Sequence, residues 1–254
     1  MHYRQLRRPK SCATMRSMGR GFAIRAPALV VVLSVLAPLE SEAGFRFEDG
    51  VYLGSAELLA DWAETMARAQ RQQPVLDACI ENRDHCSDRL RGVHTIVERA
   101  RALSQDRQLR LVNRYVNKRR YRRDRSGAVE SALAAESVPL RSRWSTLVEF
   151  MRRGGDCEDY ATSKYQLLRE LGIPAADLRV VVVFDRSTRE HHAVLAVRRH
   201  DGDVWLLDSD DSIHRSRPFG YRFVYALNET SIWDHELDAE AWSRLLQKPS
   251  EESS

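Results

Sequence analysis

The spacing of apolar residues changes near residue 178, and this change restricts the fold more than any other feature of the sequence. Before it, apolar side chains recur at three- and four-residue intervals, as on one face of an α-helix. After it, "LRVVVVFD" (178–185) is an unbroken, largely β-branched run, typical of a strand covered on both faces. Helices followed by strands predict an α+β fold in which helices pack on an antiparallel sheet.

The individual elements follow from the same pattern and from the turn residues. Helices are predicted over residues 55–69, 87–104 and 106–115, from Ser145 to the Gly154-Gly155 pair, and over 157–171. Pro74 is expected to interrupt the first helical pattern. Strands are predicted over residues 178–185, 191–199, 204–208 and 221–228, with "HDGD" (200–203) as a hairpin turn.

Residues 1–43 have the features of an export signal. Basic residues precede an apolar run at 26–39, and Ser41-Glu42-Ala43 places small residues where a signal peptidase cleaves. The run is shorter than the roughly 20 residues that span a bilayer. We therefore expect residues 1–43 to be a cleaved signal peptide and the protein to be periplasmic; an uncleaved membrane anchor is the alternative.

The charge of the chain depends on this segment. The sequence has 40 Lys and Arg against 36 Asp and Glu, a net charge of +4. Seven of the basic and two of the acidic residues lie in 1–43, leaving 33 against 34 in the rest. Because the exported part is not basic, the run "NKRRYRRDR" (117–125) is interpreted as a solvated surface, and nucleic acid is excluded as a partner.

The length after residue 43 suits one domain, predicted over 44–245, with a mainly helical lobe at 44–125 and a catalytic core at 140–230. Residues 246–254 have the composition of a disordered tail. Cys79 and Cys86 enclose six residues, which in an exported protein favours a local disulfide. A zinc site that also uses His85 is the alternative for this pair.

Cys157 is then the odd thiol of the exported chain. It occupies the first position of a predicted helix, where unpaired N–H groups and the helix dipole lower the pKa of a thiol. A small core cysteine is the alternative. A thiolate nucleophile also needs an imidazole within reach and a third group to orient that ring.

The strands after this helix offer both groups. Period-two alternation puts His191 and His192 on opposite faces of their strand. A hairpin turning at residues 201–202 makes His192 and Asp208 paired or diagonal neighbours, the distance at which a carboxylate holds a histidine ring. An ordinary His–Asp pair on an exposed hairpin is the alternative.

Three blocks, "GGDCEDYA", "HAVLAV" and "VWLLD", resemble the transglutaminase-like superfamily, and most closely its bacterial transglutaminase-like cysteine proteinases of the LapG type. The resemblance covers roughly residues 45 to 230. It implies a papain-like arrangement and assigns the nucleophile to Cys157, the base to His192 and the orienting carboxylate to Asp208. The segment 126–143 departs from the pattern, because it is small and polar where LapG-type members are aromatic-rich.

The resemblance also implies calcium dependence, with Asp156 and Glu158 as ligands. Carboxylates beside a thiol oppose thiolate formation, and a bound Ca²⁺, which prefers oxygen ligands, would cancel their field. The alternative role of Asp156 and Glu158 is to complement the helix dipole, as acidic residues in a first helical turn commonly do.

We expect an exported thiol protease that acts on a protein through an acyl-enzyme. By resemblance, the substrate is a large cell-surface adhesin whose cleavage releases cells from a biofilm, and an inner-membrane receptor regulates the protease. The alternatives are a transglutaminase or amidase with the same triad, and a non-catalytic binding module. The second oxyanion donor, beside the Cys157 N–H, is not assigned.

Overall fold

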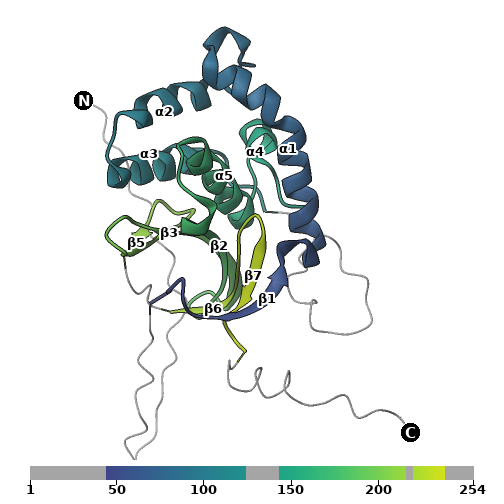
Figure 1. The fold of residues 1–254 in the computed structure, drawn as a ribbon, viewed down its shortest axis with the longest axis vertical. Coiled ribbons are helices and arrows are strands. Elements are labelled where there is room, and N and C mark those ends of the chain that lie inside the picture. Colours follow the sequence, from purple (N-terminus) through teal and green to yellow (C-terminus); the bar gives the residue numbers. More distant parts are fainter. Residues whose placement is uncertain (1–43, 124–142, 216–219, 238–254) are drawn as a thin grey trace, which may run out of the picture. The chain divides into compact units, whose positions relative to one another are not determined.

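The computed structural model describes residues 44–123, 143–215 and 220–237 (Figure 1). Its α-helices are α1 (Ala60–Glu81), α2 (Arg91–Arg101), α3 (Gln105–Asn117), α4 (Leu147–Arg153) and α5 (Cys157–Glu170). Its strands are β1 (Val51–Ser55), β2 (Leu178–Asp185), β3 (Glu190–Arg198), β4 (Val204–Leu207), β5 (Ile213–His214), β6 (Tyr221–Leu227) and β7 (Ser231–Asp234). Short 3-10 turns cover Ala56–Leu58, Arg83–His85 and Ala175–Asp177.

The strands form one antiparallel sheet in the order β1-β7-β6-β2-β3-β4-β5. Together with the helices it confirms the predicted α+β class. The expectation that all helices precede the strands is wrong in one respect. Strand β1 comes before the helices and closes the edge of the sheet beside β7, the strand farthest from it in the sequence.

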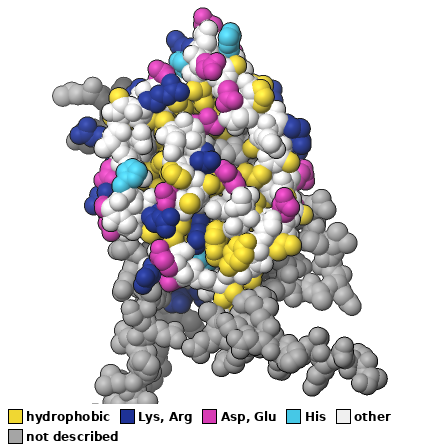
Figure 2. All heavy atoms as spheres, viewed as in Figure 1, with side chains coloured by type: hydrophobic (Ala, Val, Ile, Leu, Met, Phe, Trp, Pro, Cys, Tyr) yellow, Lys and Arg dark blue, Asp and Glu magenta, His cyan; other side chains and the backbone are white. Residues whose placement is uncertain are grey.

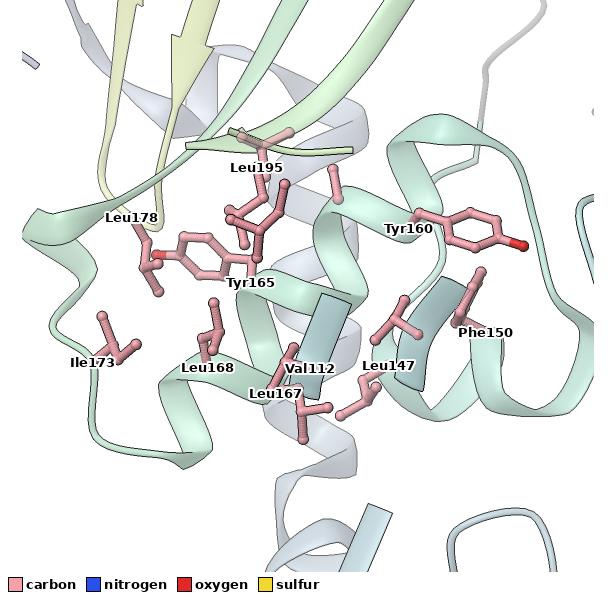
Figure 3. Packing of buried hydrophobic residues seen from close by; sticks show 14 of the residues in the cluster. Val112, Leu147, Phe150, Tyr160, Tyr165, Leu167, Leu168, Ile173, Leu178 and Leu195 are labelled. Atoms are coloured by element: carbon pink, nitrogen blue, oxygen red, sulfur yellow. The ribbon is translucent and has the colours of Figure 1, made fainter. Parts of the chain in front are cut away.

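Helix α5 is the central helix, packed on β2 and β3 on one side and on α3 and α4 on the other (Figure 1). Figure 3 shows Tyr165 and Leu168 of this helix facing Leu178 at the start of β2. These contacts position the helix start, and with it Cys157, against the sheet.

Strand β2 is buried on both faces, as its unbroken apolar run predicts. Val180 faces the main core beneath the helices. Val181 and Val183 point the other way and pack with Phe45 and Phe47 from the segment before β1. The continuous valine run is therefore required by two separate cores.

Helix α1 does not end at Pro74, which contradicts the prediction from the sequence. The helix continues to Glu81 with Pro74 inside it. Leu76, Cys79 and Ile80 lie after the proline and are buried in the main core. Their burial offsets the cost of a proline inside a helix, about 3 kcal/mol.

A disulfide joins Cys79 at the end of α1 to Cys86. Both sulfurs are used in this bond, so neither is a thiolate ligand for zinc. A local bridge of this length contributes about 2–3 kcal/mol in the chain-entropy account. It fixes the turn that leads from α1 toward α2.

The described surface carries both signs of charge. On the face drawn in Figure 2, Lys and Arg side chains are intermingled with Asp and Glu. Within the described residues, no helix is long and apolar enough to cross a membrane. The predicted signal peptide (1–43) and tail (246–254) lie outside these residues, as does most of the segment 126–143.

Candidate functional site

A tight corner between α4 and α5 places the start of the central helix. Gly154 caps α4 with a positive φ of 72°, a conformation that favours glycine. A Cβ on Gly155 would lie 2.5 Å from the Cβ and Cγ of Asp159. Gly154 is therefore required by its backbone conformation, and Gly155 by the close approach of the Asp159 side chain.

Asp159 stabilises this corner from within α5. One of its carboxylate oxygens accepts from the backbone N–H of Ser145 at 2.5 Å, and the other accepts from that of Asp156 at 3.3 Å. Burial, together with the charge of Asp156, raises the pKa of Asp159 to about 7, although the bond from Ser145 opposes the rise. Its carboxylate ties the helix start to the segment before α4.

Cys157 is the first residue of α5 and is partly exposed. Its thiol donates to Glu158 Oε2 at 3.3 Å, and the backbone N–H of Ala193, next to His192 on β3, points at the sulfur. Burial and then the charge of Glu158 raise the pKa of the thiol well above its usual range, against the lowering effect of the Ala193 N–H. The lowered pKa expected from a helix start alone is thus absent in this geometry.

His192 and Asp208 meet across the β3–β4 hairpin. Leu195 pairs with Leu207, so Asp208 follows the last paired residue of β4 and lies diagonal to His192. His192 Nε2 lies 2.7 Å from Asp208 Oδ1, and the Asp208 side chain is only 3% exposed. With Nε2 bound to the carboxylate, Nδ1 is the nitrogen left for proton exchange.

The carboxylate of Asp208 has several further partners. Its Oδ2 accepts from Tyr221 Oη at 2.6 Å and lies 3.5 Å from His214 Nε2. Its Oδ1 accepts from the backbone N–H of Ser209 at 2.6 Å. Burial alone would raise the pKa of Asp208, but the bonds from His192, His214 and Tyr221 hold it far below the usual range. These contacts therefore favour the ionised form of Asp208.

Two helices hold the backbone of Asp208. Lys164 Nζ from α5 and Asn117 Nδ2 from α3 donate to its carbonyl oxygen at 2.6 and 2.7 Å. The sequence prediction missed Lys164, Asn117, Tyr221 and His214. Of these four, only Lys164 could have been recognised from the sequence, because it is a lysine on the buried apolar face of α5. It follows Cys157 by seven residues, which is about two helical turns.

Asp156 and Glu158 flank Cys157, as the sequence requires. Tyr121, which bridges to Gly155, has a pKa raised to about 12, first by burial and then by Cys157, Asp156 and Glu158. A negative field therefore covers the helix start. Nowhere in residues 44–123, 143–215 and 220–237 do three His, Cys, Asp or Glu side chains form a group that could hold a metal ion.

Comparison with known proteins matches the chain to one family and to solved structures of one protein. The family model described as bacterial transglutaminase-like cysteine proteinase matches residues 67–240. The solved structure of Legionella pneumophila LapG is similar at 24% identity, with a TM-score of 0.50, over 68% of this chain and 92% of that one. Its calcium-bound form matches at 23% identity and the same TM-score, over 70% of this chain and 97% of that one. An EGTA-treated form matches at 23% identity, over 68% and 94%. No curated protein matches the chain significantly.

Proposed function

This chain belongs to the bacterial transglutaminase-like cysteine proteinases and is a cysteine peptidase, and we propose that it cleaves a protein substrate through Cys157, His192 and Asp208. The observation that carries the assignment of residues is the 2.7 Å contact between His192 Nε2 and the buried Asp208 carboxylate. It leaves Nδ1 of a fixed imidazole available on the strand that also points the Ala193 N–H at the cysteine.

The proposed reaction uses these groups in turn. His192 takes the proton of Cys157, and the sulfur attacks the scissile carbonyl carbon. The oxyanion lies at the start of α5, where the Cys157 N–H is one donor. His192 returns the proton to the leaving amine, and a thioester remains. His192 then deprotonates a water molecule, which hydrolyses the thioester and regenerates the thiol, while Asp208 orients the imidazole throughout.

The resting geometry favours a protonated thiol, because Cys157 donates to Glu158 and lies in a negative field. We propose that Asp156 and Glu158 hold a calcium ion, which supplies the positive charge that this field lacks. These oxygen donors fit a hard cation, with backbone carbonyls or water completing a set that the side chains alone do not provide. Calcium-bound and EGTA-treated structures of Legionella pneumophila LapG support this proposal.

The setting is proposed from the sequence. The signal-like segment 1–43 and the Cys79–Cys86 disulfide support export to the periplasm. By family resemblance, the substrate is a large cell-surface adhesin, its cleavage releases cells from a biofilm, and an inner-membrane receptor regulates the protease.

The test is to incubate the purified exported protein with surface proteins of the source bacterium and to label new N-termini, with Cys157→Ala as the control. New N-termini in a large surface protein, dependent on Cys157 and on calcium, are expected. Release of ammonia with incorporation of a labelled amine into glutamine would instead indicate a transglutaminase or amidase. Neither product, together with a normal cellular phenotype for His192→Ala, would indicate a binding module.

A further inference from the structure

Lys164 is a buried charged group that the proposed reaction does not use. Its side chain is fully buried on α5. Within the described residues, its Nζ donates to one acceptor, the backbone carbonyl oxygen of Asp208, at 2.6 Å. Lysine is almost never fully buried unless its ammonium is paired, so this position has a specific reason to be polar.

The environment of Lys164 points to Asp208. Burial lowers the pKa of Lys164 to about 7, against the opposing effect of Asp208, Asp211 and Asp210. A nonpolar side chain of similar length would fill the same space without the cost of burying an ammonium group. What the lysine adds over such a side chain is its hydrogen bond to Asp208.

The bond links the two halves of the site. Helix α5 carries Cys157 at its first position and Lys164 about two turns later, on the same side of the helix. Asn117 of α3 donates to the same carbonyl, and the Asp208 N–H donates to the Ser212 carbonyl at 3.0 Å. The backbone of Asp208 is thus fixed to the helix of the nucleophile, while its carboxylate holds His192.

We propose that Lys164 is a positioning residue that, with Asn117, holds Asp208 at the place from which it orients His192 toward Cys157. This inference rests on the proposed triad. It extends that site by a buried hydrogen-bond donor to the backbone of Asp208, on a side chain outside the proposed triad. Loss of Lys164 frees the segment after β4, so that the imidazole loses its fixed orientation.

The test is a double-mutant cycle on the full chain, expressed for export and purified in calcium-containing buffer. The rate of iodoacetamide alkylation of Cys157 is measured by mass spectrometry for Lys164→Met, Asp208→Ala and the double variant. Lys164→Met is expected to lower the rate about tenfold or more, since small misplacements of catalytic groups cost factors of this size. In the Asp208→Ala background it is expected to change nothing.

Lys118→Met is the matched control, because Lys118 is an exposed lysine at the end of α3. The inference is overturned if a folded Lys164→Met variant is alkylated at the wild-type rate. It is also overturned if Lys164→Met lowers the rate by the same factor in the Asp208→Ala background. If Lys164→Met does not fold, Asn117→Ala is put through the same cycle with the same criteria. If His192→Ala is alkylated at the wild-type rate, the triad itself is contradicted. Failure of the triad can therefore be distinguished from failure of the Lys164 inference alone.

Discussion

At the scale of single residues, Glu158 opposes ionisation of the neighbouring Cys157 thiol. It accepts the thiol hydrogen bond and raises the pKa of Cys157, second only to burial. We predict that Glu158→Gln in calcium-free buffer speeds alkylation of Cys157 at pH 8, by about tenfold for each unit by which the pKa of Cys157 falls. Glu170→Gln on the same helix is the control. A slower rate in Glu158→Gln would show that the carboxylate does not oppose the thiolate.

The sequence predicted those residues of the site that depend on local geometry. His192 and Asp208 are joined by one hairpin, so period-two alternation and the turn position place them together. Lys164, Asn117 and Tyr221 reach Asp208 from α5, α3 and β6, and these approaches depend on how distant elements pack. No local pattern encodes such contacts, although a lysine on a buried helical stripe is a usable signal.

At the scale of elements, the start of α5 depends on close contact at Gly155. A Cβ there would meet the Asp159 carboxylate, which also caps the helix. We predict that Gly155→Ala lowers the free energy of unfolding by about 1–3 kcal/mol and slows alkylation of Cys157. Urea denaturation and the alkylation rate measure the two effects.

Gly172→Ala is the control for this prediction. Gly172 follows the last turn of α5 and has a φ of 84°, but a Cβ added there would meet no atom within 4 Å. It is expected to lose stability because alanine is strained at positive φ, while the reactivity of Cys157 is unchanged. Equal loss of reactivity in both variants would contradict a specific role for the corner.

The elements that the sequence predicted are the long, strongly patterned ones. Helix α5 and strands β2, β3, β4 and β6 lie within a residue or two of their expected bounds. Strands β1, β5 and β7 were missed, because they are short and are stabilised by pairing with other strands rather than by their own pattern. The end of α1 was wrong because core packing after Pro74 outweighs a local signal.

At the scale of the whole molecule, buried ionisable groups make stability depend on pH. The pKa of Lys164 is about 7 in the folded protein and about 10.4 in an unfolded chain. Between these values the unfolded chain binds more protons, so the free energy of unfolding rises with pH, by at most about 1.4 kcal/mol per unit from this group.

Asp159 acts in the opposite sense at lower pH. Its pKa of about 7 exceeds the unfolded value, so its contribution to stability is lost as pH rises from about 4 to 7.

We predict that the stability difference between wild type and Lys164→Met changes in favour of wild type from pH 7 to 9.5, measured by urea denaturation. A difference independent of pH would mean that Lys164 keeps an ordinary pKa.

If Cys157, His192 and Asp208 form one reactive unit, the ionisation of Cys157 depends on His192. The decisive experiment is the pH dependence of Cys157 alkylation in calcium-containing buffer, compared between wild type and His192→Ala. An unperturbed thiol titrates near 8.5. We predict an apparent pKa of Cys157 well below that value in wild type, raised by loss of His192 and by EGTA. Values of 8.5 or above in both proteins, with calcium present, would contradict it.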